Sequence, residues 1–354
     1  MMRMTVLASG SKGNSTVIAS SRTRVLVDAG LSCRELLKRM AVAGEDPSRL
    51  DAILITHEHQ DHIAGLAVLA RRLKIPVFFT ESTHRAWVRM LTPRSTMTYA
   101  KWLDHVQREK EVRAATIAAS TSTAGFAAQW AAQSEAIASI SAEAAALQRS
   151  DDPNASLELP VDPDDEDLCS PELDSAAQKT APKSDPTYLP AVEYFHSGTQ
   201  FSIGDIDITP FTIPHDAADP CGFVFESEGI RMALATDLGY MSPNVKSALK
   251  RIDVLLLESN HDLEMLRDGP YPWSVKQRVL SRVGHLSNHA TAEFLQKDYD
   301  GGASWIVLGH LSESNNAPEL ARLAAEQALS AQPTLLGNRI LLAGQTVPLD
   351  PISL

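Results

Sequence analysis

Four side chains that commonly bind metal ions occur within six consecutive positions of the 354-residue chain. The segment from His57 to His62 reads HEHQDH and follows the apolar run 52–55 after one residue, Thr56. A turn from a strand into a helix can direct His57, His59, Asp61 and His62 at one point, which a straight strand or a helix could not do. Imidazole and carboxylate ligands suit zinc, manganese or iron. The spacing H-x-H-x-D-H therefore predicts a site for divalent metal ions.

Three further potential ligands each lie at the end of a run that has the composition of a strand. His215, Asp237 and His310 follow the runs 208–213, 230–236 and 305–309. One cluster of ligands cannot complete two metal sites, so we expect these residues to supply the rest. Asp28 ends a fourth such run, 24–27. It is expected to hold a ligand histidine through the ring nitrogen that does not face the metal.

Short elements must position these residues. Strands are expected at 5–8, 17–19, 24–28, 52–56, 77–80, 207–211, 222–226, 230–236, 254–258 and 305–308, because these runs are β-branched or apolar and are bounded by turn residues. Helices are expected at about 32–43, 62–73, 83–91, 243–251, 272–282, 288–297 and 317–330. Glu228-Gly229 is typical of a hairpin turn. The pattern predicts an α+β fold, with two sheets packed face to face and helices outside, each block of the chain supplying one half.

The two blocks, 1–107 and 191–354, are expected to form a single domain that is interrupted by an insertion at 108–190. The chain has 44 acidic and 32 basic residues and a net charge of -12. Residues 151–190 hold 11 acids and two lysines, a net charge of -9, so the rest is nearly neutral. This composition excludes a broad basic face. It predicts a largely disordered low-complexity segment. The segment is either a tolerated loop extension or an arm that binds a protein partner.

Cysteine content and hydropathy restrict the compartment. The three cysteines, Cys33, Cys169 and Cys221, form no C-x-x-C pair, which excludes a cysteine-based zinc cluster and suits a reducing environment. The chain shows no signal-peptide core and no apolar stretch of about 20 residues, the length needed to span a bilayer. A cytoplasmic protein that does not enter the membrane is expected.

The motifs together resemble the metallo-β-lactamase superfamily of metal-dependent hydrolases, across both blocks and without the insertion. The similarity is greatest to its bacterial YycJ/WalJ-like branch. It rests on the HEHQDH cluster and on LASGSKGNS at 7–15, VDAGLS at 27–32, PHDAADP at 214–220, ATDLGY at 235–240, ESNHD at 258–262, GPYPWS at 269–274 and HLSESNN at 310–316. The resemblance implies a four-layer αββα sandwich. It also implies a nuclease, with 5′-to-3′ exonuclease action on DNA.

The resemblance further implies a site with two divalent metal ions, zinc or manganese. His57, His59 and His215 would hold one ion, Asp61, His62 and His310 the other, and Asp237 would bridge them. A hydroxide shared by the two ions would then attack phosphorus. The pocket would be locally positive although the chain is acidic, which favours a phosphate.

The leaving oxygen of a phosphodiester needs a proton. Residues 283–290 resemble the segment that supplies a histidine general acid in phosphodiesterases of the superfamily, and the matching position is His285. Glu258 is expected to orient it. A surface residue that caps a helix is the simpler interpretation of His285. Candidate contacts with substrate are Asn260, Arg278, Arg282, Ser312 and Asn315. Tyr271 and Trp273 could stack on bases or serve in packing.

Two other functions remain open from the sequence. A thioester or lactam hydrolase would use the same metals but would not need a His285–Glu258 acid. A metal-bound scaffold would use the acidic segment to recruit a basic partner. The presence of all seven candidate ligands argues against an inactive site.

Overall fold

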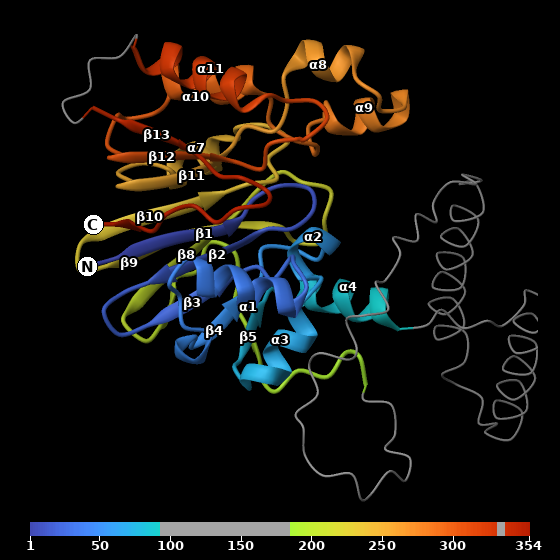
Figure 1. Ribbon diagram of the computed structural model, residues 1–354, viewed down its shortest axis with the longest axis vertical. Helices are drawn as coiled ribbons and strands as arrows, with labels where there is room; N and C mark the ends of the chain where they lie inside the picture. Colours follow the sequence, from blue (N-terminus) through green and yellow to red (C-terminus); the bar gives the residue numbers. More distant parts are fainter. Residues whose placement is uncertain (93–184, 331–336) are drawn as a thin grey trace, which may run out of the picture. The chain divides into compact units, whose positions relative to one another are not determined.

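The computed structural model describes residues 1–92, 185–330 and 337–354. All of these residues belong to one compact unit. Most of the expected insertion, 108–190, lies outside the described residues. The prediction that this segment is disordered concerns the same residues and therefore also lies outside them. The described residues form two seven-stranded sheets that stack face to face between helices (Figure 1).

The first sheet carries the amino-terminal block. Its order is β14-β1-β2-β3-β4-β5-β6, antiparallel from β14 to β3 and parallel from β3 to β6. Its strands are β1 (Arg3–Ala8), β2 (Ser15–Ala19), β3 (Arg24–Val27), β4 (Ala52–Leu54), β5 (Val77–Phe79), β6 (Val192–Tyr194) and β14 (Ile352–Ser353). The outer strands β6 and β14 come from the second block. The prediction that each block supplies one half is therefore wrong at these two edges, where strands of two and three residues give too little pattern to recognise.

The second sheet has the order β13-β12-β11-β10-β9-β8-β7. Its strands are β7 (Phe201–Ile203), β8 (Ile206–Thr212), β9 (Cys221–Ser227), β10 (Ile230–Ala235), β11 (Val254–Glu258), β12 (Trp305–Gly309) and β13 (Arg339–Leu342). The strands β7 to β10 are antiparallel, and β10 to β13 are parallel. Glu228 and Gly229 join β9 to β10 with φ angles of 53° and 77°, the two positive values that a type I′ hairpin requires. This confirms the expected turn.

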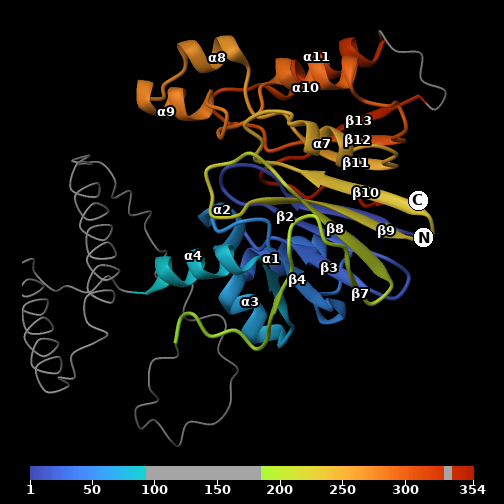
Figure 2. The ribbon, with the colours of Figure 1, turned by 180° about the vertical axis from the view of Figure 1, so that it is seen from behind.

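Helices cover the outer face of each sheet (Figures 1 and 2). One core packs the two sheets together, and two others pack each sheet against its helices. The αββα prediction is confirmed. The helices of the first sheet are α1 (Cys33–Val42), α2 (Gln60–Ile63), α3 (Leu66–Leu73) and α4 (Glu81–Leu91), with a 3-10 turn η1 (Pro47–Arg49). The second half has α7 (Pro243–Ala248), α8 (Leu263–Asp268), α9 (Trp273–Val279), α10 (Asn288–Lys297) and α11 (Pro318–Ser330).

The helix expected over 62–73 is two helices, α2 and α3, separated at Ala64-Gly65. Gly65 lies against the loop that precedes α1: its N–H donates to the carbonyl of Ala29. A Cβ at this position would lie 2.1 Å from the carbonyl oxygen of Leu31. Only glycine permits this approach, so the chain changes direction here and α2 stays short. The short α2 leaves His59, Asp61 and His62 at the end of the sheet.

Candidate metal centre

Five strand ends converge on one place and carry most of the expected site. Asp28 follows β3, His57 follows β4, Asp237 follows β10, and His310 follows β12, while Glu258 is the last residue of β11. All five residues are buried. These are carboxyl ends of strands in two facing sheets, so residues far apart in sequence reach a common centre.

Three of these residues adopt an unusual backbone conformation. Asp28, Asp237 and His310 have φ angles of 61°, 63° and 55°. Non-glycine residues seldom adopt positive φ, and such strain is found preferentially at functional sites. The left-handed residue turns the chain sharply where the strand ends. The side chain then points toward the centre and does not follow the pattern in which successive side chains of a strand point to opposite faces of the sheet.

The first group of potential ligands consists of His57, His59 and His215. Nδ1 of His59 lies 3.2 Å from Nε2 of His57 and 3.2 Å from Nε2 of His215. Burial lowers the pKa of His57 strongly and also lowers that of His215. These imidazoles are therefore neutral near pH 7, which is the form that binds a metal.

The second group consists of Asp61, His62 and His310, whose ligand atoms lie within 4.8 Å of one another. Oδ2 of Asp61 lies 3.4 Å from Nε2 of His62 and 3.5 Å from Nε2 of His310. Burial opposes ionisation of Asp61, but the positive charge of His62, together with hydrogen bonds from His310 and His62, holds its pKa well below the usual range. This carboxyl group is therefore a carboxylate.

Asp237 lies between the two groups. Its Oδ2 is 3.4 Å from Nε2 of His62, and its Oδ1 is 3.5 Å from Nε2 of His310 and 3.9 Å from Nε2 of His215. Within the described residues, Oδ2 of Asp237 and Nε2 of His310 are buried without a hydrogen-bond partner. Buried polar atoms without a partner are costly in a native protein. Nitrogen and oxygen donors that face one another in this way suit a divalent metal ion.

In His62 and His215, the ring nitrogen that faces away from the centre has a partner. Nδ1 of His62 lies 2.8 Å from Oδ2 of Asp28, the residue that was expected to hold a ligand histidine. The backbone N–H of Thr56 donates to the other oxygen of Asp28 at 2.9 Å. Nδ1 of His215 is 3.2 Å from the carbonyl of Gly284. Such contacts fix the tautomer of a ligand histidine and its orientation.

An Asp28→Asn variant should bind metal about 10- to 100-fold more weakly than the parent protein. The backbone conformation is kept, since asparagine tolerates positive φ. An amide can donate as well as accept, so it no longer fixes the tautomer of His62. Competition with a chromophoric chelator measures the change. Asp268→Asn, at an exposed carboxylate, serves as the control, and equal metal affinity in the two variants would contradict the role of Asp28.

Two supporting residues were not found from the sequence. Nδ2 of Asn14 donates to Oδ2 of Asp61 at 3.0 Å, and the N–H of Asn14 donates to the carbonyl of Asp61 at 2.7 Å. Oε1 of Glu58 accepts the N–H of Ala218 at 2.8 Å and so ties the HEHQDH segment to the loop that carries His215. Asn14 lies in the LASGSKGNS motif and Glu58 in the HEHQDH motif, but neither motif indicated what these two side chains contact.

Glu258 contacts two histidines. Its Oε1 lies 2.8 Å from Nδ1 of His285 and 3.0 Å from Nδ1 of His310. Its Oε2 accepts the N–H groups of Leu238 and Leu286. Burial raises the pKa of Glu258, but the two histidines outweigh that effect and lower it. An ionised Glu258 thus holds His285, whose side chain is 21% exposed.

A cavity of about 370 Å³ opens over these residues. Its lining combines ligand candidates with residues of the surrounding loops: Ser11, His59, Gln60, Asp61, Met90, Asp237, Asn260, Tyr271, Arg278, Val279, His285, His310 and Ser312. Three of the expected substrate contacts, Asn260, Arg278 and Ser312, therefore reach the cavity.

The other two expected substrate contacts are elsewhere. The guanidinium of Arg282 lies over the ring of Tyr240, 4.4 Å from its centroid, and does not line the cavity. Asn315 is buried, and its N–H and Nδ2 donate to the hydroxyl of Ser312. Proximity in sequence to a site motif suggested both residues, but each side chain is used to support a neighbouring loop.

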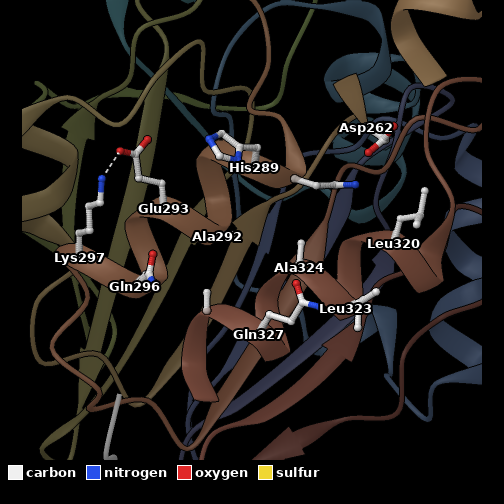
Figure 3. Close-up of a pocket in the computed structure, with 12 residues that line it drawn as sticks. Asp262, His289, Ala292, Glu293, Gln296, Lys297, Leu320, Leu323, Ala324 and Gln327 are labelled. Carbon is white, nitrogen blue, oxygen red and sulfur yellow. Dashed lines mark hydrogen bonds and ion pairs between the residues drawn. The ribbon is translucent and has the colours of Figure 1, made fainter. Parts of the chain in front are cut away.

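A larger cavity, about 510 Å³, lies between α10 and α11 (Figure 3). None of the seven ligand candidates lines it. Figure 3 shows Glu293 and Lys297 paired along α10, at 2.8 Å, and Leu323 on α11 across the groove. Size alone would favour this cavity, but the convergent polar groups lie in the smaller one.

Comparison with known proteins agrees with the fold and the metal-capable centre. Sequence models of the metallo-β-lactamase superfamily and of the β-lactamase superfamily domain match residues 8–118 and 168–310. The crystal structure of the metallo-β-lactamase fold protein YhfI from Bacillus subtilis covers 98% of this chain and 98% of its own, with a TM-score of 0.54 and 13% identity. The fold is that of a metallo-β-lactamase hydrolase.

Two curated relatives refine the class. Exodeoxyribonuclease WalJ from Streptococcus pneumoniae is 30% identical over 328 residues, which cover 93% of this chain and 88% of the relative. Exodeoxyribonuclease YycJ from Bacillus anthracis is also 30% identical, with 93% and 89% covered. The chain therefore belongs to the YycJ/WalJ-like branch of the metallo-β-lactamase superfamily. In residues 1–92, 185–330 and 337–354, no helix has the length and apolar character needed to cross a membrane.

Proposed function

We propose that the protein is a DNA exonuclease that depends on two divalent metal ions. The observation that carries this proposal is the pair of ligand groups with Asp237 between them, together with His285 on the wall of the same cavity and Glu258 in contact with His285. The names of the WalJ and YycJ relatives support DNA as substrate and exonuclease as activity. Attack in the 5′-to-3′ direction is proposed from the resemblance to that branch.

The donor set suits zinc or manganese. His57, His59 and His215 would hold one ion, Asp61, His62 and His310 the other, and Asp237 both. When bound, the two ions supply an activated water and stabilise negative charge on a phosphodiester.

The other residues act on the substrate. Glu258 accepts a hydrogen bond from Nδ1 of His285, which leaves Nε2 of His285 to give a proton to the leaving oxygen. Arg278, Asn260 and Ser312 would contact phosphate oxygens from the wall of the cavity. A thioester or lactam hydrolase has less need of such an acid, so the buried Glu258 favours a phosphodiesterase.

We further propose that 1–107 and 191–354 form one catalytic domain and that 108–190 is an accessory insertion. The many carboxylates of 151–190 would suit a basic protein partner. On the basis of the cysteine content, we also propose that the protein is cytoplasmic.

Metal analysis coupled to degradation of end-labelled DNA tests the proposal. The purified chain should contain about two divalent ions and shorten DNA from its 5′ end, with RNA of the same sequence degraded more slowly. An Asp61→Ala variant should lose activity and one ion, while Asp268→Asn should keep both. Turnover of a thioester or a cephalosporin without any degradation of DNA would exclude the proposed function.

A further inference from the structure

Helix α9 is unusual because none of its seven residues is buried. Trp273, its first residue, is 68% exposed and makes no ring contact with any other described residue. Of the fifteen large hydrophobic side chains that are exposed in the described part of the chain, five lie between 263 and 283: Leu263, Trp273, Val275, Leu280 and Val283. Exposed apolar groups at this density indicate an interaction surface.

The charge of this segment distinguishes it from the rest of an acidic protein. Residues 269–284 contain Lys276, Arg278 and Arg282 but no aspartate or glutamate, in a chain with a net charge of -12. The ammonium of Lys276 donates to the carbonyl of Arg267, and it forms no ion pair within the described residues. Arg282 lies on a tyrosine ring and likewise has no carboxylate partner there. A cationic surface with exposed apolar groups suits a polyanion that also presents flat rings.

The segment also continues directly from the cavity. Tyr271, Arg278 and Val279 line the same cavity as Asp61 and His285. Figures 1 and 2 both place α8 and α9 beyond the strands, on the side where α2 lies. A DNA strand with one phosphate at the metal centre could therefore leave the cavity along α9.

We infer that α9 binds the DNA strand that continues from the scissile phosphate, with a base stacked on Trp273 and a backbone phosphate held by Lys276. This inference rests on the proposed function, because it assumes DNA in the cavity. Nucleic acid is favoured over a protein partner because residues 269–284 combine four of these exposed apolar side chains with two cations, Lys276 and Arg282, that have no carboxylate partner in the described part of the chain, while the third cation, Arg278, pairs with Asp216. Stacking on an aromatic side chain does not depend on which base is present, so α9 would bind without sequence preference.

Anisotropy titrations with fluorescent DNA test the inference, with the full chain carrying Asp61→Ala to prevent cleavage. Trp273→Ala should raise the Kd for a twelve-nucleotide strand by roughly tenfold, the effect of losing one stacked base. Lys276→Gln should reduce the slope of log K against log salt by about one, the contribution of one neutralised phosphate. In chains with Asp61 intact, both variants should hydrolyse bis-p-nitrophenyl phosphate at the parent rate, because this small substrate does not extend to α9.

Matched controls lie at the larger cavity, between α10 and α11. Leu323 is 50% exposed on α11, and Lys297 pairs with Glu293 on α10 (Figure 3). Leu323→Ala and Lys297→Gln should leave DNA binding unchanged. Parent-like DNA binding by both α9 variants, while the parent still degrades DNA, would overturn the inference alone and leave the surface to a protein partner. A parent that neither binds nor degrades DNA would instead refute the proposed function.

Discussion

An Asp237→Asn variant should lose activity on DNA by about a thousandfold or more, beyond the effect of removing a single electrostatic donor from an active site. The carboxylate of Asp237 faces His62, His215 and His310 at 3.4 to 3.9 Å and so lies between the two ligand groups, which is why we propose that it serves both. Asparagine removes its negative charge and one of its two ligand oxygens. The backbone should be retained, because asparagine adopts positive φ more readily than most residues.

Metal content distinguishes the loss of a ligand shared by both ions from the loss of a ligand that holds one ion. Asp237→Asn should weaken binding of both ions, whereas Asp61→Ala should weaken only the one that His62 and His310 hold. Elemental analysis after dialysis, with kcat measured on end-labelled DNA, gives both quantities. Loss of one ion only would show that Asp237 belongs to a single group, and an unchanged rate would remove it from the catalytic centre. Asp268→Asn is the control for a change of charge at an exposed site.

The accuracy of the sequence-based predictions depends on how local each feature is. The HEHQDH segment has its ligands within six positions, so the strand-to-helix turn alone determines that they can converge. The Glu228-Gly229 hairpin is equally local and was predicted correctly. Asp237 and His310 could be chosen because each ends an apolar run. The αββα arrangement followed from the order of strands and helices together with the resemblance.

Features that depend on contacts between distant segments could not be predicted. The sequence suggested that Glu258 orients His285, but its second contact, with His310, arises because β11 and β12 are adjacent parallel strands. Asn14 supports Asp61 across 47 positions. The break at Gly65 is caused by the close approach of the Leu31 carbonyl. The pattern of apolar residues along the helix gives no sign of this contact. Arg282 and Asn315 were suggested by their neighbours in sequence, but side-chain direction is determined by the loops around them.

His285→Ala should lower turnover of DNA by about 10²- to 10⁴-fold, the usual contribution of a general acid. The reason is chemical: the leaving alkoxide of DNA is a strong base and needs a proton as the bond to phosphorus breaks. The p-nitrophenolate of bis-p-nitrophenyl phosphate leaves without one, so the same variant should lose less than about tenfold on that substrate. The difference between the two substrates identifies the role of His285 more securely than the loss of activity alone.

Metal content decides between an acid and a ligand for His285. The side chains of Asp237, Glu258, His285 and His310 also form a group that could hold a metal ion. If His285 is the acid, His285→Ala should keep both ions, because Glu258 still holds His310 at 3.0 Å. Glu258→Gln should reduce both metal affinity and turnover, since the same oxygen contacts His285 and His310. Loss of an ion from His285→Ala, or equal losses on the two substrates, would exclude the proton-donor role and make His285 a ligand or a structural residue.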